Sequence, residues 1–131
     1  MRSDQEFREF RARLVGVHDG DNVRLVMDQG FDVTVRKWLR LRDVFAPELS
    51  HTGGQASETF VRNWLGRHFH RDPPTTWPWL VRTYRTSGDN DVTTFGRYVA
   101  DVSCVGCGAS LNAAVQAFLA DHKEWGGGTG G

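Results

Sequence analysis

The chain has 131 residues, a length that suits one domain. Its sixteen basic and sixteen acidic residues cancel, which disfavours a protein that coats nucleic acid through bulk positive charge. Any nucleic-acid contact must therefore come from a local cluster. No run approaches the roughly 18 apolar residues of a membrane-spanning helix, and the charged segment Met1-Arg2-Ser3-Asp4 is unlike a secretory signal. We expect a cytoplasmic protein that makes no membrane contact.

The first third of the chain has the alternation of apolar and polar residues that is typical of strands. Arg11 to Val17 and Val23 to Met27 predict two strands, joined into a hairpin by the polar turn His18 to Asn22. Phe31 to Leu41 predicts a third strand. Its phase slips near Lys37-Trp38, where we expect a bulge.

A helix, two strands and a second helix are predicted next. Thr52 and Gln55 have the spacing of a capping box, and a helical stripe runs behind them from Ala56 to Leu65. Further strands are expected over Trp79 to Thr86 and Arg97 to Ser103. The order β-β-β-α-β-β is mainly β and suits a small closed barrel.

The last predicted element is a helix with a good capping residue. Ser110 can cap it, and its apolar stripe runs from Leu111 to Leu119. It completes an α+β fold of order β-β-β-α-β-β-α. We place this fold in one domain over residues 10–122, after an extension over 1–9 and before a flexible Gly-rich tail over 123–131.

Three segments carry charged residues that together suit phosphodiester cleavage. Asp19-Gly20-Asp21 places two carboxylates in a hairpin turn, and such pairs attract calcium and magnesium. Arg40 and Glu48 follow in the second segment, and Arg97 begins a strand in the third. Two arginines can neutralise a pentacoordinate phosphate, a glutamate can deprotonate water, and a cation can polarise a phosphate oxygen. The alternative is three unrelated surface salt bridges.

From about Phe10 to Leu119 the chain resembles the thermonuclease family, whose type member is staphylococcal nuclease. The matching pieces, in the family's order and approximate spacing, are HDGDNVRL (18–25), RLRDVFAPE (40–48), GGQAS (53–57), FGRY (95–98) and SLNAAV (110–115). The resemblance implies a five-stranded OB-fold barrel carrying helices. It also implies a calcium-dependent endonuclease that cleaves DNA and RNA with little sequence preference.

The resemblance assigns roles to individual residues. Asp21 matches the family's carboxylate metal ligand, and Ala46 stands where a backbone carbonyl completes the metal site. Glu48 matches the proposed general base, while Arg40 and Arg97 match the two phosphate-binding arginines. The implied partner is single-stranded or frayed DNA or RNA, bound by a monomer.

One position departs from the family. Phe45 stands where a second metal-binding Asp is usual, and a phenyl ring cannot ligate a hard cation, so calcium binding should be weakened. Asp43, two residues earlier, could share the strand face of Phe45 and substitute in part. The departure supports an alternative, a nuclease-like module that binds nucleic acid or a protein partner without cutting. An accessory protein of a phage or mobile element is a third hypothesis.

Two further signals are weighed against simpler explanations. Cys104 and Cys107 form half of a structural zinc motif, with His68 and His70 as the best-spaced additional donors. There is no second C-x-x-C, so we favour a Gly-rich turn with two reduced thiols over a zinc ion. Trp38, Trp64, Trp77 and Trp79 could stack on nucleic-acid bases, but core packing is the simpler explanation for Trp64, Trp77 and Trp79.

Overall fold

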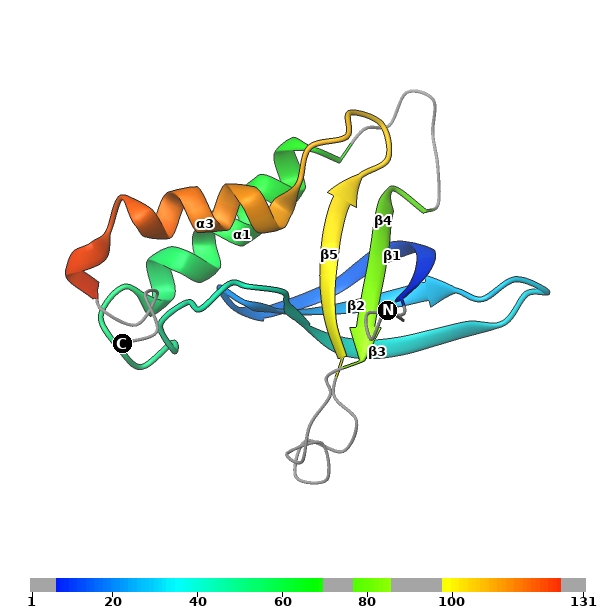
Figure 1. Ribbon diagram of the computed structural model, residues 1–131, viewed down its shortest axis with the longest axis horizontal. Helices are drawn as coiled ribbons and strands as arrows, with labels where there is room; N and C mark the ends of the chain where they lie inside the picture. The colour runs from blue at the N-terminus through cyan, green and yellow to red at the C-terminus, as the bar shows by residue number, and fades with distance from the viewer. Residues whose placement is uncertain (1–6, 70–76, 86–97, 126–131) are drawn as a thin grey trace, which may run out of the picture.

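The computed structural model describes residues 7–69, 77–85 and 98–125. Two helices lie side by side against one side of a twisted barrel of strands (Figure 1). In chain order the elements are β1 (Phe7–Asp19), β2 (Asn22–Asp28), β3 (Thr34–Leu41), α1 (Gly54–Arg67), β4 (Trp79–Arg85), β5 (Tyr98–Cys104), α3 (Leu111–Ala120) and the 3₁₀ helix η1 (Lys123–Trp125).

The five strands close into a barrel in the order β1-β2-β3-β5-β4. The β3–β5 pair is parallel, with Arg40 opposite Val99, and the other pairs are antiparallel. Strand β1 closes the barrel against β4, from Phe7 opposite Tyr84 onward. This is an OB-like α+β fold, so the predicted small barrel carrying helices is confirmed.

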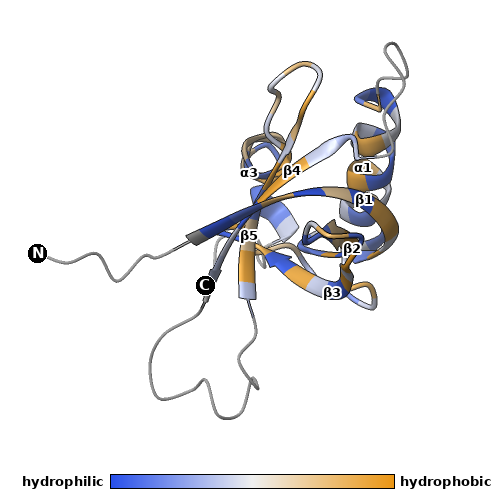
Figure 2. Cartoon of the chain, turned by 90° about the vertical axis from the view of Figure 1, so that its right-hand side faces the viewer, coloured by the Kyte–Doolittle hydropathy of each residue, from blue (hydrophilic) through white to orange (hydrophobic). Residues whose placement is uncertain are grey.

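One core fills the barrel and continues between the helices. Alternate residues of the strands point inward, among them Leu25, Leu39 and Val81, and all three are almost completely buried. The apolar stripes of α1 and α3 complete the core, and the rings of Phe60 and Phe118 stack at 4.3 Å between the two helices. Figure 2 shows hydrophobic and hydrophilic residues alternating along α1, as its periodicity predicts.

The third strand begins later than its alternation predicts. Phe31 and Asp32 have positive φ angles of 55° and 63°, and Phe31 is fully exposed. The backbone N–H of Gln29 donates to the carbonyl of Val33 at 2.8 Å, which closes the connection between β2 and β3. Apolar residues in a turn therefore mimicked a strand pattern.

The bulge predicted near Lys37-Trp38 is absent. Strands β2 and β3 pair in unbroken register from Asn22 opposite Arg40 to Asp28 opposite Thr34. The register shifts lie in β1 instead, and the second of them immediately precedes the β1–β2 turn. The irregularities thus fall in the half of β1 that pairs with β2, while Phe7 to Ala12 pair with β4 in unbroken register.

The helix starts differ in how well they were predicted. The capping box at Thr52 and Gln55 is wrong, because α1 is capped by Gly53, whose φ is 86° and which makes no side-chain cap. The cap at Ser110 is confirmed, since its hydroxyl accepts the N–H of Ala113 at 3.1 Å.

Within the described ranges, no helix has the length and apolar character that crossing a membrane requires.

A buried amide ties α3 to the barrel. The side chain of Asn112 accepts the N–H of Val102 at 2.9 Å and donates to the carbonyls of Ala100 and Arg42 at 2.9 and 3.0 Å. These bonds fix the segment after β3 relative to β5. The apolar stripe of α3 gave no hint of this polar contact.

Candidate functional site

The turn between β1 and β2 packs tightly against two other segments. A Cβ atom on Gly20 would lie 2.5 Å from the Cβ of Ala46 and 2.7 Å from the Cβ of Ser57, so only glycine fits. Ser57 is buried in α1, and its hydroxyl donates to the carbonyl of Gly53 at 2.8 Å. The turn therefore lies against both the loop after β3 and the start of α1.

Asp21 is at the centre of this contact and is only 7% exposed. Its Oδ2 accepts the backbone N–H of Ala46 at 3.2 Å and lies 4.0 Å from Nη2 of Arg40. The sheet brings these groups together, because Asn22 is paired with Arg40 and the carbonyl of Asp21 accepts the N–H of Leu41 at 2.8 Å.

A second carboxylate belongs to the same turn. Asp19 is 8% exposed, and its Oδ1 accepts the backbone N–H of Asp21 at 3.1 Å. Burial raises the pKa of Asp21 to about 7, with the hydrogen bond and charge of Asp19 adding to the rise, while Arg40 and the Ala46 N–H oppose it. The Asp21 carboxyl therefore takes up a proton at a much higher pH than an ordinary aspartate does. The resemblance named Asp21 alone, whereas the Asp-Gly-Asp spacing pointed to both.

Arg40 is accessible to a ligand beside this acid pair. Its side chain is partly exposed, and its Cζ lies 5.5 Å from the ring centre of Phe45, which is itself half-exposed. A guanidinium has five N–H donors, and a single ion pair at 4.0 Å leaves several of them available to a ligand. Arg40 can therefore bind a phosphate while it remains next to Asp21.

Glu48 lies at the rim and not with the acid pair. Its side chain is 76% exposed and its Oε1 is 4.0 Å from Nδ1 of His51. Ala46 contacts Asp21 through its N–H and not through a carbonyl. Across residues 7–69, 77–85 and 98–125, no group of three or more His, Cys, Asp or Glu side chains is placed to hold a metal ion.

The remaining predicted residues lie elsewhere or outside the described ranges. Strand β3 ends at Leu41, so Asp43 and Phe45 do not share a strand face, and that premise is wrong. Asp43 has a φ of 60°, and its carbonyl accepts a hydrogen bond from the side chain of Gln116 in α3 at 2.9 Å. Arg97 lies outside the described residues, as does His70.

The outer face of β2 and β3 adds an aromatic and basic surface next to Arg40. Trp38 is 46% exposed and is paired across the sheet with Arg24, whose Cζ lies 5.6 Å from the indole ring. The ring of His18 meets the same indole edge-on at 5.9 Å. An exposed tryptophan beside an arginine and a histidine is the kind of surface on which a base can stack.

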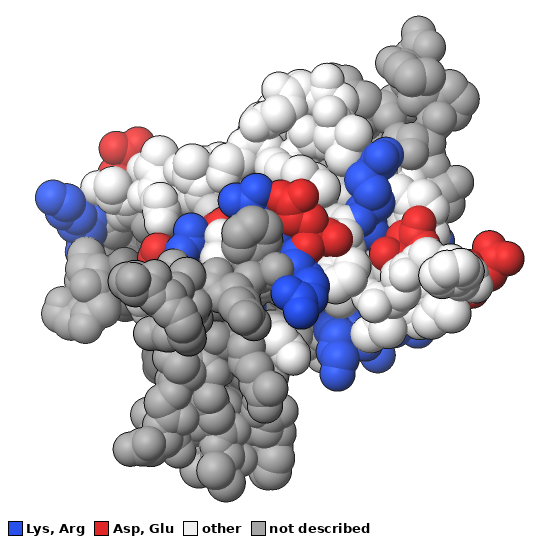
Figure 3. Space-filling view, turned by 45° about the vertical axis from the view of Figure 1, so that its right-hand side comes forward, with Lys and Arg blue, Asp and Glu red and all other residues white. Residues whose placement is uncertain are grey.

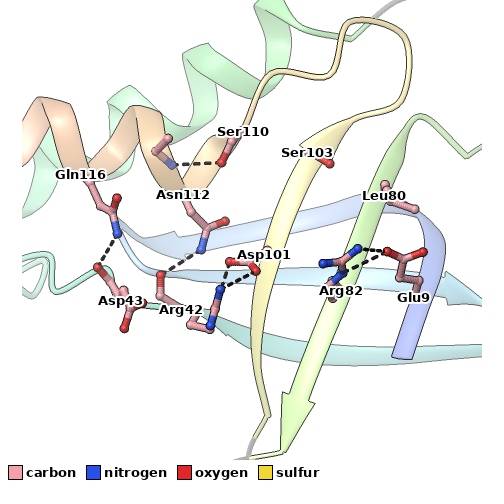
Figure 4. Close-up of a pocket in the computed structure, with 11 residues that line it drawn as sticks. Glu9, Arg42, Asp43, Leu80, Arg82, Asp101, Ser103, Ser110, Asn112 and Gln116 are labelled. Carbon is pink, nitrogen blue, oxygen red and sulfur yellow. Dashed lines mark hydrogen bonds and ion pairs between the residues drawn. The ribbon is translucent and has the colours of Figure 1, made fainter. Parts of the chain in front are cut away.

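A cavity of about 500 Å³ lies apart from this turn, between the strands β4 and β5 and the helix α3 (Figure 4). Four of its five charged side chains are paired with one another, and Asp43 is the fifth. Arg42 binds Asp101 at 3.1 Å, Arg82 binds Glu9, and the hydroxyl of Tyr84 donates to Asp101 at 3.2 Å. The face in Figure 3 likewise shows cations interspersed with anions. We therefore favour the Asp21 turn as the functional site, since its charges are less completely compensated.

The raised pKa of Asp21 predicts a pH-dependent stability. The pKa is about 7 in the folded chain against 3.8 for an unperturbed carboxyl, so the folded state binds more protons between these values. The contribution of Asp21 to the free energy of unfolding therefore falls as pH rises from about 4 to about 7. Asp21→Asn cannot titrate, and its melting temperature should fall less over this interval than that of the wild type. Thermal unfolding followed by circular dichroism measures both slopes.

The matched control is Asp43→Asn, which removes an exposed carboxyl outside the pair. It should keep the wild-type slope. Equal slopes for Asp21→Asn and the wild type would show that the Asp21 carboxyl titrates normally.

No family model matches the chain, and no curated protein matches it either. The likeness to the thermonuclease family therefore rests on the motifs in the sequence.

Proposed function

We propose that the chain is an endonuclease of the staphylococcal-nuclease-like type, a metal-assisted phosphodiesterase acting on DNA or RNA with little sequence preference. The buried Asp19–Asp21 pair with Arg40 beside it is the observation that carries the proposal. Two buried carboxylates in one turn are a fitting set of oxygen donors for a divalent cation, with Ca²⁺ first among candidates. A bound cation supplies Lewis-acid polarisation of a phosphate oxygen.

Arg40 holds the phosphate in this proposal. Its guanidinium is partly exposed and lies 4.0 Å from the carboxylate that binds the cation, so a phosphate oxygen can reach both. Arg97 is the proposed second phosphate ligand. The register supports it, because Val99, two residues after Arg97 in the chain, is the parallel partner of Arg40.

Glu48 is the proposed general base. It follows Ala46 by two residues on the loop that contacts Asp21, and its exposed carboxylate can accept a proton from water. Without a substrate, the hydrogen bonds of catalytic groups are often long. The exposed position of Glu48 is compatible with a base that meets its water only when nucleic acid is bound.

The surface beside Arg40 supports nucleic acid as the substrate. Trp38 and Arg40 are both on the outer face of β3, two residues apart, so a base stacked on the indole would carry its phosphate toward the guanidinium. The guanidinium of Arg24 lies over the same indole and adds positive charge to this face. A single-stranded or frayed end would present its bases to this face.

The second candidate is a module that binds nucleic acid or a protein partner without cutting. Phe45 favours it, because its ring lies beside Arg40 at the position of the missing carboxylate. The distance of Glu48 from the acid pair favours it as well. The two candidates differ in whether Glu48 contributes to a chemical step.

Glu48 and Arg40 separate the two candidates. Glu48→Gln should slow cleavage by about 10²–10⁴-fold, as loss of a general base does, while the dissociation constant for single-stranded DNA stays constant or falls. Arg40→Ala should weaken binding and slow cleavage, because the guanidinium holds the phosphate in substrate and transition state alike. Both quantities are measured at one salt concentration with Ca²⁺, Mg²⁺, Mn²⁺ or EDTA.

Arg36→Ala is the matched control, since it removes an exposed arginine from the same strand at a distance from Asp21. Its effect should be confined to a small loss of affinity. If Glu48→Gln equals the wild type in both rate and affinity, the module that only binds replaces the enzyme.

Phe45→Asp should lower the concentration of Ca²⁺ required for activity. A carboxylate at this position adds one anionic oxygen ligand, and we expect half-saturation to fall on the order of tenfold or more. Phe45→Asn is the control, because it removes the ring without adding charge. A titration of cleavage rate against Ca²⁺ measures the change. Equal requirements in wild type and Phe45→Asp would mean that residue 45 does not face the cation.

A further inference from the structure

Two thiols and an imidazole meet at a place that the proposed function does not use. Cys104 ends β5, Cys107 lies in the turn that follows, and His68 is the residue at which α1 ends. Cys104 is at the opposite end of β5 from Val99, the strand partner of Arg40. The cluster is therefore separate from the Asp21 turn.

Both thiols contact the same histidine. Sγ of Cys107 lies 3.5 Å from Nδ1 of His68, and the thiol of Cys104 donates to the backbone carbonyl of His68 at 3.3 Å. In a tetrahedral zinc site with Zn–S of about 2.3 Å and Zn–N of about 2.0–2.1 Å, a sulfur and a nitrogen ligand are about 3.6 Å apart. The distance between Cys107 and His68 already matches one edge of such a tetrahedron.

The turn holds the two cysteines in a conformation that suits metal binding. The N–H of Cys107 donates to Sγ of Cys104 at 3.2 Å, a bond that becomes stronger when the sulfur is a metal-binding thiolate. The carbonyl of Cys104 accepts the N–H of Gly108 at 2.8 Å, and Gly108 has a φ of 76°, which glycine adopts without strain.

The histidine is held as well. Its ring stacks on Trp64 at 4.2 Å, and its backbone N–H donates to the carbonyl of Trp64 at 3.0 Å. Trp64 is buried, so the end of α1 and the ring of His68 are anchored in the core. Little side-chain entropy remains to be lost when the imidazole binds an ion.

We propose that Cys104, Cys107 and His68 bind a zinc ion that ties the end of α1 to the turn between β5 and α3. Two thiolates and an imidazole are ligands for a borderline-soft cation and not for calcium or magnesium. Zn²⁺ replaces the two thiol protons, which pass to solvent. Because the described residues do not yet form a converged group of three donors, the thiol of Cys104 must turn from the His68 carbonyl toward the ion. Three protein ligands leave one tetrahedral position for another donor or water.

The test uses the reduced, chelator-treated full-length protein and Co²⁺ as a spectroscopic substitute for zinc. Wild type should bind one equivalent of Co²⁺ with a thiolate-to-cobalt charge-transfer band, and Zn²⁺ should displace it. Cys104→Ser and Cys107→Ser should each lose stoichiometric binding. His68→Gln should keep the charge-transfer band, because both thiolates remain. It should weaken the affinity for Co²⁺ by more than about tenfold, because losing even a residue that only supports a metal ligand costs about tenfold in affinity.

His122→Gln is the matched histidine control, because His122 stacks on Trp125 and does not contact either thiol. It should bind cobalt as the wild type does. Cys107 is exposed, so Cys107→Ser should fold normally and keeps the test decisive if Cys104→Ser does not fold.

The absence of a thiolate–cobalt band in the reduced wild type would overturn the proposal, as would equal affinity in wild type and Cys107→Ser. A reduced protein that takes up no metal, and that forms a Cys104–Cys107 disulfide with oxidised glutathione, would also overturn it. The two cysteines would then be a redox pair. Because the readout is metal uptake, its failure does not affect the proposed nuclease activity.

Discussion

The close approach at Gly20 is the constraint on which the candidate site depends. Without a side chain there, the β1–β2 turn can pack against Ala46 and Ser57, and three segments distant in sequence meet at one point. The contact buries Asp19 and Asp21 together, and burial is the main cause of the raised pKa of Asp21. A larger residue at position 20 would separate the turn from the loop and return both carboxylates to water.

The barrel supplies the rest of the site through its pairing. Antiparallel pairing of β2 and β3 places Arg40 beside the turn, and parallel pairing of β3 and β5 continues the sheet at Val99. The groups that we propose to bind the cation and the phosphate thus lie on adjacent parts of one sheet, which suits a reaction that depends on positioning. Neutral net charge is consistent with this arrangement, since attraction for phosphate needs only a local cluster.

The sequence predicted the features that depend on local pattern and missed those that depend on packing. Hairpin, helix stripes and the Ser110 cap follow from periodicity and residue type. Of the second motif segment, Arg40 and Ala46 lie beside Asp21, whereas Glu48 lies at the rim. Phe31 showed that alternation alone does not make a strand, because positive φ angles turn the chain there. The burial of Asp19 and the bonds of Asn112 arise between distant segments, and no spacing rule encodes them. The contact of His68 with Cys107 joins residues that the sequence had offered as possible zinc donors, although it favoured a turn without metal.

The central claim is that a divalent cation binds at the Asp19–Asp21 turn, and paramagnetic Mn²⁺ locates such a cation directly. Two-dimensional NMR spectra of the ¹⁵N-labelled protein are recorded at substoichiometric Mn²⁺, with Asp21→Asn as the reference. We predict selective broadening of the amide signals of Asp19, Gly20, Asp21 and Ala46 in the wild type, and its loss in Asp21→Asn. Broadening centred on Glu9 and Asp101, or unchanged by Asp21→Asn, would contradict the account.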